Sequence, residues 1–294
     1  MENARLEIRG VNKQFTAVKA LDNADFSLQP GEVHALLGIN GAGKSTLIKV
    51  ISGIYTKDSG EIYKDGKQVS IQNPQDAIRL GISTVYQDPQ MVESFTGYEN
   101  IYLGEENRKK GFLTPMSRGE MKKRARELLK EYPLQIDIEK PVYLLSAIER
   151  EILAVLRALS KKCDVLILDE PTAGLDPRGR DEILDQIDHL HRERGMTIIL
   201  VSHSMEDVAR YADRLIVMNH GQKVYDGTPK EVFRHYRELE AIGLAAPQIT
   251  YLVHDLRAQG IDIDGDITTV EEAKEAILGQ WNRNLTESSR DKNV

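Results

Sequence analysis

The segment GINGAGKST, Gly38 to Thr46, constrains the fold of this chain more than any other part of its sequence. A glycine, four residues and then Gly-Lys-Ser/Thr form a loop whose backbone N–H groups curl around phosphate oxygens. Such a loop needs a strand before it and a helix after it, because the helix N-terminus adds its dipole to the site. An apolar run, VHALL, precedes the segment and an apolar-periodic run, TLIKVIS, follows it. The sequence therefore predicts a phosphate-binding loop rather than a glycine-rich turn with an incidental lysine.

The residues of this loop have separate expected roles. Lys44 is expected to pair with the β- and γ-phosphates of a nucleotide, and Ser45 to hold Mg²⁺. The other residues expected to surround the nucleotide are Gly38, Asn40, Gly41, Gly43 and Thr46. ATP and Mg²⁺ are therefore the predicted cofactors.

Two further polar groups follow short apolar runs that are typical of central parallel strands. VLILDEP ends in Asp169 and Glu170, and TIILVSH ends in His203. A carboxylate beside a phosphate loop can hold Mg²⁺ through water, and a second one can deprotonate an attacking water. We expect Asp169 in the first role, Glu170 in the second, and a γ-phosphate contact for His203.

The order of the remaining patterns indicates an α/β protein. A helical pattern, RGRDEILDQIDHLHRE, separates the two apolar runs, which makes a strand–helix–strand unit. RLEIRGV alternates like a strand, and GEIYKDGKQV predicts a hairpin around Asp65 and Gly66. Helical patterns dominate from about residue 93 to 159 and again from 229 to about 278, and a polar tail follows.

Composition excludes several classes of protein. The net charge of −7 disfavours nucleic acid as a partner, because phosphate neutralisation needs a basic surface. Cys163 is the only cysteine, so no intrachain disulfide forms, and its apolar surroundings favour a structural role. The sequence shows neither a signal peptide nor a run of membrane-spanning length. A cytoplasmic protein is expected, with docking on a membrane protein still open.

The ordered set of motifs resembles the ATP-binding cassette (ABC) ATPases, the motor subunits of ABC transporters, from Leu6 to about Gly227. Phe15 matches the family's adenine-stacking aromatic, and Gln87 matches the glutamine that contacts Mg²⁺ and couples to the membrane subunit. Asp176 matches the loop that crosses to the partner, and His203 matches the switch histidine. Taken singly, Phe15 and Gln87 would be an ordinary core aromatic and an ordinary surface glutamine.

The resemblance implies a fold and a domain division. The expected fold is an α/β P-loop NTPase core of ABC type with an antiparallel β subdomain, a helical signature subdomain and a C-terminal helical extension. The cassette is expected over residues 1–228, with its helical subdomain at about 93–159. A helical accessory region that stabilises a dimer, and is not needed for nucleotide binding, is expected over 229–280, and a disordered tail over 281–294.

The two halves of the chain resemble different branches of the family. LLGINGAGKSTLIKVISG and YENIYLGEE are similar to the first half of the tandem ATPases of carbohydrate importers. LILDEPTAGLDPRGRDEIL and the region after Asp226 are similar to ATPases of energy-coupling-factor transporters. A natural mosaic and a constructed chimera joined between about Leu144 and Asp169 both fit this pattern. Because the chain has no second phosphate loop, its partner cassette has to be another chain.

The family's signature, Leu-Ser-Gly-Gly-Gln, aligns with Leu145 to Glu149. Ser146 is retained, and with Glu149 it predicts a capping box. Ile148 stands where the family has a glycine that approaches the partner's γ-phosphate, so we expect crowding there. A heterodimer is therefore favoured over a homodimer, since a partner's intact signature would complete the site built on this chain.

The resemblance implies an ATP-hydrolysing subunit of an ABC importer, peripheral on the inner face of the cell membrane and bound to transmembrane permease subunits. Two alternatives stay open on the sequence. One is a regulatory or weakly active subunit with a degenerate signature, and the other is a soluble ABC ATPase outside transport. The transported substrate is not encoded in this chain.

Overall fold

The computed structural model describes residues 4–104, 117–132 and 134–290, with side chains as far as residue 281. A four-stranded antiparallel sheet has the order β2-β1-β4-β5. Its strands are β1 (Leu6–Phe15), β2 (Val18–Leu28), β4 (Ser59–Lys64) and β5 (Lys67–Val69). Asp65 and Gly66 both have positive φ (51° and 75°), as a two-residue hairpin turn requires. The predicted hairpin is confirmed.

The second sheet has six strands in the order β10-β9-β3-β8-β7-β6. They are β3 (Val33–Leu37), β6 (Ile82–Val85), β7 (Val165–Asp169), β8 (Thr197–Val201), β9 (Arg214–Asn219) and β10 (Gln222–Gly227). The first five run parallel, and β10 is an antiparallel edge strand. Every residue of β3 and β8 is buried, which is typical of a parallel sheet covered on both faces. The α/β class is confirmed.

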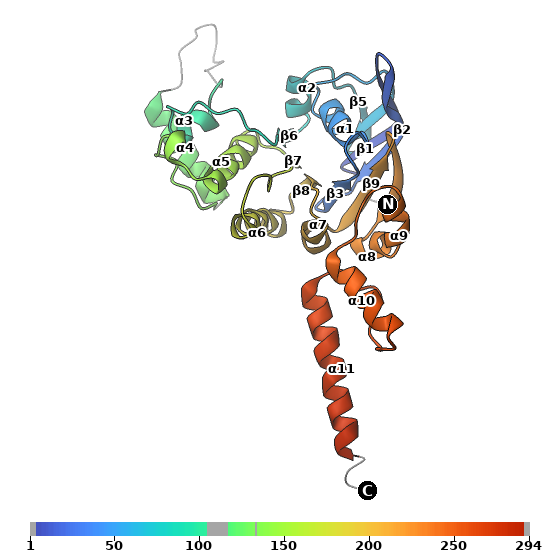
Figure 1. The fold of residues 1–294 in the computed structure, drawn as a ribbon. Helices are drawn as coiled ribbons and strands as arrows, with labels where there is room; N and C mark the ends of the chain where they lie inside the picture. Colours follow the sequence, from blue (N-terminus) through green and yellow to red (C-terminus); the bar gives the residue numbers. More distant parts are fainter. Residues whose placement is uncertain (1–3, 105–116, 133, 291–294) are drawn as a thin grey trace.

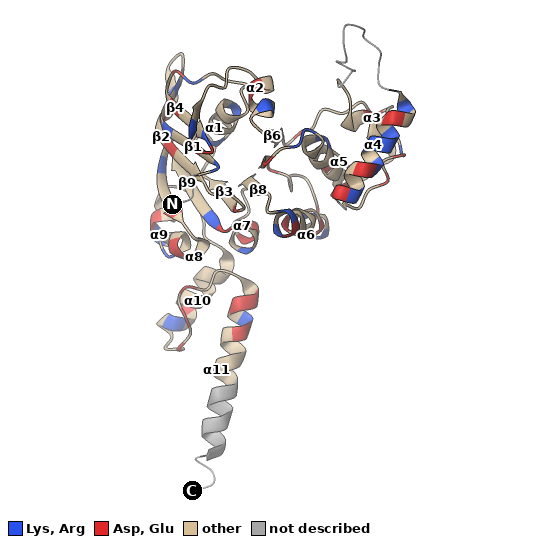
Figure 2. Cartoon of the chain, turned by 180° about the vertical axis from the view of Figure 1, so that it is seen from behind, with Lys and Arg blue, Asp and Glu red and all other residues tan. Residues whose placement is uncertain are grey.

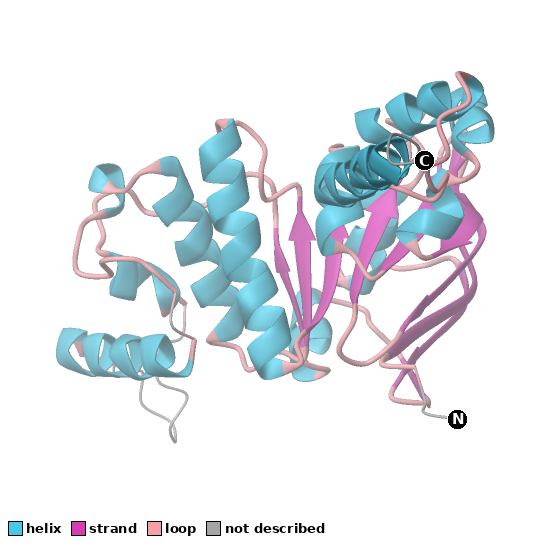
Figure 3. Ribbon diagram, turned by 90° about the horizontal axis from the view of Figure 1, so that it is seen from below, coloured by secondary structure: helices cyan, strands magenta, loops and turns pink. Residues whose placement is uncertain are grey.

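Helices lie on both sides of the six-stranded sheet (Figure 3), and alternate residues of its central strands pack against different layers. On one face, Ile167 and Ile199 pack with α1 (Lys44–Ile51), α2 (Pro74–Arg79) and the antiparallel sheet. On the other face, Leu166 and Leu200 pack with α5 (Ala147–Leu159) and α6 (Pro177–Arg194). The short α7 (Met205–Tyr211) joins a third cluster beside β3 and β9. The central sheet is thus packed on both faces, and the carboxyl ends of its parallel strands lie at one edge of that sheet.

A helical part lies beside β6, away from α1 (Figure 1). It contains α3 (Gly97–Ile101), α4 (Arg118–Glu131), the 3₁₀ turn η1 (Val142–Leu144) and the start of α5. These elements fall within the predicted range of 93–159, part of which lies outside the described residues. Figure 2 shows both charge signs on α4. Arg124 pairs with Glu120, and Lys122 and Arg126 both pair with Glu139, as expected of a solvated helix face.

Four helices follow β10: α8 (Pro229–Phe233), α9 (Tyr236–Ala241), α10 (Gln248–Ala258) and α11 (Val270–Arg290). Phe233 and Leu239, from α8 and α9, share a core with Leu37 and Val217 of the central sheet. Residues from α10 onward form a separate small cluster, which contains Val253, Ile263, Ile267 and Ala273. The expected boundary at residue 228 therefore crosses a shared core, and the packing changes near residue 247.

Helix α11 projects away from the rest of the molecule (Figure 1). It continues to Arg290, so residues 281–290 of the predicted disordered tail are helical, and residues 291–294 lie outside the described part. In the part of the chain that the structure describes, none of the helices has both the length and the apolar character needed to cross a membrane.

Candidate nucleotide site

The phosphate loop lies where the sequence predicts it, between the buried strand β3 and helix α1. Two of its glycines are required by close backbone contacts. A Cβ on Gly43, which has φ 105°, would lie 2.6 Å from the Ala20 carbonyl oxygen. A Cβ on Gly38 would lie 2.6 Å from the Met218 carbonyl oxygen. Both distances are too short for a side chain, so the loop can only follow this path with glycine.

Lys44, the one charged residue of the loop Gly38–Thr46, is buried, with 6% of its surface exposed. Its Nζ donates hydrogen bonds to the carbonyl oxygens of Gly38 (2.5 Å) and Ile39 (3.2 Å). Burial lowers the pKa of the Lys44 ammonium, against the opposing influence of Glu170 and Asp169. An ammonium held by two loop carbonyls inside a phosphate loop is placed to pair with phosphate oxygens.

The acidic pair, Asp169 and Glu170, and His203 come together at the same sheet edge. Asp169, the last residue of β7, is in register with Val201 of β8, and the Glu170 N–H donates to the Val201 carbonyl at 3.0 Å. Glu170 has φ 57°, a left-handed conformation that is uncommon for a side-chain-bearing residue and turns the chain sharply after the strand. His203 Nε2 then lies 2.8 Å from Glu170 Oε1.

Asp169, Ser45 and Gln87 carry oxygen groups of the kind that suits a magnesium ion. Burial, reinforced by the neighbouring Glu170, raises the pKa of the Asp169 carboxyl, so a nearby cation would favour its ionised form. Ser45 is the second residue of α1 and is exposed, and Gln87 is exposed just beyond β6, which is parallel to β7. A hydroxyl, a carboxylate and an amide oxygen form the hard ligand set that Mg²⁺ prefers, alongside phosphate oxygens and water.

Phe15 and Asp176 have contacts that the sequence does not reveal. Phe15 ends β1, is 37% exposed, and packs edge-on to Tyr55 with ring centroids 5.0 Å apart. It therefore presents an aromatic surface that suits base stacking. The Asp176 carboxylate accepts a hydrogen bond from the Gly179 N–H at 2.7 Å and caps α6. That cap gives Asp176 a local structural role in addition to the expected contact with a partner.

The signature segment keeps its cap but orients Ile148 differently from the expectation. The predicted capping box is confirmed: Ser146 Oγ accepts from the Glu149 N–H (3.2 Å), and Glu149 Oε2 accepts from the Ser146 N–H (2.8 Å). The half-buried Ile148 side chain packs against α6, where Gly179 makes room for it. A Cβ on Gly179 would lie 3.0 Å from Ile148 Cδ1. The Ile148 side chain is thus directed toward α6 of its own chain. Comparison of this one position with the glycine of the family's signature does not predict that direction.

A polar cavity of about 320 Å³ opens beside Glu170 and His203. Arg180 and Glu206 line it together with residues that follow β7 and β8. The sequence marks neither residue as functional, because Arg180 lies one turn inside α6 and neither residue belongs to a motif. Their placement depends on how α6 and α7 pack.

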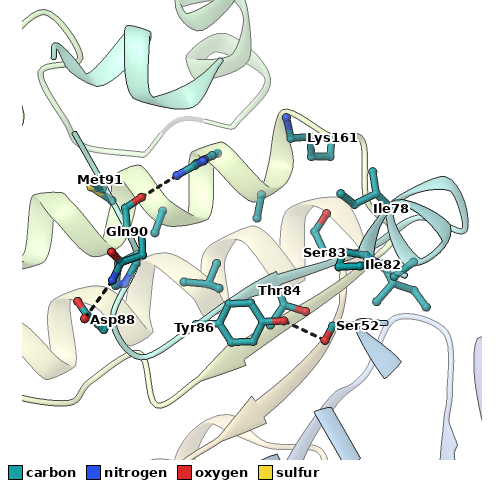
Figure 4. A pocket seen from close by; sticks show the side chains of 17 residues that line it. Ser52, Ile78, Ile82, Ser83, Thr84, Tyr86, Asp88, Gln90, Met91 and Lys161 are labelled. Atoms are coloured by element: carbon teal, nitrogen blue, oxygen red, sulfur yellow. Dashed lines mark hydrogen bonds between the residues drawn. The ribbon is translucent and has the colours of Figure 1, made fainter. Parts of the chain in front are cut away.

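A second cavity, of about 380 Å³, lies between α2, β6 and α5, next to the segment that follows Gln87 (Figure 4). Tyr86 Oη donates to Ser52 Oγ at 2.9 Å, and Arg157 donates to the Gln90 carbonyl at 2.9 Å. The first bond ties Tyr86, the residue before Gln87, to the loop after α1, and the second ties the segment after Gln87 to α5. The residues on the two sides of Gln87 are therefore linked to different parts of the cassette.

Comparison with known proteins agrees with this geometry. The ABC transporter family model matches residues 21–173, and a model of an AAA domain, putative AbiEii toxin of a type IV system, matches residues 141–207. The energy-coupling factor transporter ATP-binding protein EcfA2 of Clostridium perfringens is 42% identical over 88% of this chain and 90% of its own length. The ribose import ATP-binding protein RbsA 1 of Rubrobacter xylanophilus is 44% identical over 74% of this chain and 43% of its own length.

The fold has equally clear counterparts among solved structures. CbiO1 from Clostridium perfringens, part of the ABC transporter complex cbiONQ, superposes with a TM-score of 0.70. It is 33% identical and covers 86% of this chain and 100% of its own. Relatives from energy-coupling-factor and sugar transporters both appear, as the two-branch resemblance predicts. Through its matched family model, its motifs and its fold, the chain belongs to the ATP-binding subunits of ABC transporters.

Proposed function

We propose that this chain binds ATP with Mg²⁺ and hydrolyses it to energise uptake of a small solute through separate membrane subunits. The observation that carries the proposal is the convergence of Lys44, Asp169, Glu170 and His203 at one edge of the central sheet. The relatives named for energy-coupling-factor and ribose transport support an importer. They do not favour a soluble ABC ATPase outside transport.

Each side chain has one step in this proposal. Lys44 and the loop N–H groups orient the β- and γ-phosphates, and Ser45, Gln87 and Asp169 would hold Mg²⁺, whose charge offsets that of the phosphates. Glu170 accepts the proton of the attacking water, and the nearby His203 fixes the position of Glu170 Oε1. Phe15 supports the base of the nucleotide, on the exposed side of its ring.

The cavity beside Gln87 is our proposed docking groove for a permease subunit. Its lining is mainly apolar, with Arg157 and Lys161 at its α5 side and Asp88 near Gln87. Since Tyr86, before Gln87, bonds to the loop after α1 and Gln90, after it, bonds to α5, a change at the nucleotide site can be passed to a bound membrane subunit. This role for the groove extends the expectation for Gln87.

A second cassette completes the site in this proposal, with Asp176 and Ser146 presented to the partner chain. The contact between Ile148 and α6 removes the main argument against a homodimer, because the side chain is directed toward its own chain. Homodimer and heterodimer can be separated by size-exclusion chromatography of the chain alone with ATP.

Glu170→Gln tests the proposal. This variant should bind ATP with the affinity of the parent, hydrolyse it at least about a hundredfold more slowly, and elute as a closed dimer with ATP. Glu238→Gln, at an exposed position on α9, is the matched control and should behave like the parent. If Glu170→Gln turns over ATP at the parental rate, Glu170 is not the base and the proposed mechanism fails.

A further inference from the structure

The segment Gly243–Gln248, which follows α9 and ends at the first residue of α10, lies against the phosphate loop. Gly243 has φ 82°, and a Cβ on it would lie 3.2 Å from Cγ2 of Ile39. Ile39 is the residue directly after the first glycine of the loop, and it packs into the same cluster as Leu244. Gly243, Leu244 and Ala245 line a cavity of about 350 Å³ together with Asn40 and His203.

The same segment contacts the start of α7, directly after the loop that carries His203. Met205, the first residue of α7, is buried in one cluster with Leu244 and Ala246. The Gln248 N–H donates to Glu206 Oε1 at 3.3 Å. A single stretch of the accessory region therefore touches the phosphate loop and the helix start that follows His203.

These contacts reach the groups that would hold phosphate. Lys44 Nζ donates to the Ile39 carbonyl, so a shift of Ile39 moves an anchor of the ammonium as well as the following loop N–H groups. The segment itself is anchored to α10, because the Ala246 N–H donates to Tyr251 Oη at 3.1 Å. Movement of the accessory helices is thereby linked to the phosphate loop through Gly243 and to the start of α7 through Glu206.

We infer that Gly243–Gln248 is a positioning segment of the nucleotide site, with Ile39 and Glu206 as its points of contact. The accessory helices then act on nucleotide binding and turnover as well as on dimer formation. This inference rests on the proposed function, because the elements it positions are those of the ATP site.

Gly243→Ala tests the phosphate-loop contact, with Gly260→Ala as the matched control. The two glycines have similar conformations (φ 82° and 87°), but a Cβ on Gly260 would meet nothing within 4 Å. Both substitutions therefore introduce similar backbone strain, and only the first presses on Ile39. Fluorescent ATP and ADP titrations of the full chain should show a loss of affinity of about fivefold or more for Gly243→Ala. Gly260→Ala should bind both nucleotides with the affinity of the parent, although its Tm should fall as much as that of Gly243→Ala.

A double-mutant cycle shows whether the effect passes through Ile39. An Ile39→Ala background lacks the Cγ2 atom that the new Cβ at position 243 would crowd. Gly243→Ala should therefore reduce the affinity for nucleotide less in that background than in the parent. An equal loss of nucleotide affinity in both backgrounds would overturn the inference, and so would equal losses for Gly243→Ala and Gly260→Ala. Neither result would contradict the proposal that the chain binds ATP. A parent chain that binds no nucleotide would overturn the proposed function as well.

The contact with the start of α7 has its own test, which does not depend on Gly243→Ala folding. Glu206→Gln keeps an oxygen that can accept from the Gln248 N–H, whereas Glu206→Ala removes it. Steady-state ATPase assays should show a lower kcat with an unchanged KM for Glu206→Ala, and recovery in Glu206→Gln. If the two variants have the same kcat, the bond to Gln248 does not position the helix start that follows His203, and this half of the inference is wrong.

Discussion

Truncation after Gly227, the end of β10, should not leave a stable nucleotide-binding protein, contrary to the expectation from sequence. The cut removes α8, α9 and the segment after them, whose Val232, Phe233, Leu239 and Leu244 are almost completely buried. Burial of each such side chain contributes about 1.5–3 kcal/mol, so the four together contribute about 6–12 kcal/mol. That sum is comparable with the whole unfolding free energy of a typical protein, about 5–15 kcal/mol.

Truncation after Pro247 is the informative comparison. It retains this core and removes α10 and α11, which have their own small cluster. It loses the Tyr251 side chain, which packs against the retained core, so a moderate fall in Tm is expected. Thermal unfolding followed by circular dichroism, together with fluorescent ATP titration, should show a cooperative transition and ATP binding for this shorter chain.

The same assays on the Gly227 truncation should show aggregation or a broad, low-temperature transition. A soluble Gly227 truncation that unfolds cooperatively within a few degrees of the full chain would refute the reasoning. It would mean that α8 and α9 only cover the cassette and do not complete its core.

Three further predictions follow from single residues. Ile148→Gly should lower Tm, because the side chain loses its contact with Gly179 and a glycine destabilises the helix by about 1 kcal/mol. The ATPase rate of the folded protein should stay within about twofold of the parental rate, below the smallest typical coupling between sites. A clear increase in the ATPase rate would restore the hypothesis that Ile148 crowds the partner's γ-phosphate. Gly43→Ala should abolish ATP binding, because its Cβ would lie 2.6 Å from the Ala20 carbonyl oxygen; titration with fluorescent ATP tests this, and parental affinity would contradict it. Burial raises the pKa of Glu151 to about 7. A buried acid with a raised pKa destabilises the fold as pH rises through that value, so Glu151→Gln should raise the unfolding free energy at pH 8, by at most about 3 kcal/mol, and change it little at pH 5. Denaturant unfolding at both pH values checks this, and an equal effect at both would contradict it.

The parts of the fold that repeat a local pattern were predictable from sequence. The strand, loop and helix around Lys44 follow from glycine spacing and apolar periodicity, and the run VLILDE places Asp169 at the end of a buried strand. The meeting of Glu170 and His203 follows from parallel strands, whose carboxyl ends share one edge. Each of these features is determined by residues that are close in the sequence or by a general rule of sheet topology.

The features that sequence did not predict depend on packing between distant segments. Ile148 leans on α6 because Gly179, 31 positions later, leaves space for its side chain. The packing of α8 and α9 on β3 and β9 was not predicted, because the apolar residues of these helices give no sign of their partners. The contact of Gly243 with Ile39 joins residues more than 200 positions apart, and no motif records it.

The most direct test of the account is titration of Lys44→Ala with Mg²⁺ and a fluorescent ATP analogue. Lys44 is the buried ammonium that the loop carbonyls hold for the phosphates, so its removal should weaken binding by about tenfold or more, the value of a charged hydrogen bond. Lys67→Ala, at an exposed position on β5, is the matched control and should bind like the parent. Parental affinity in Lys44→Ala, with the same Tm, would contradict the assignment of this loop as the ATP site.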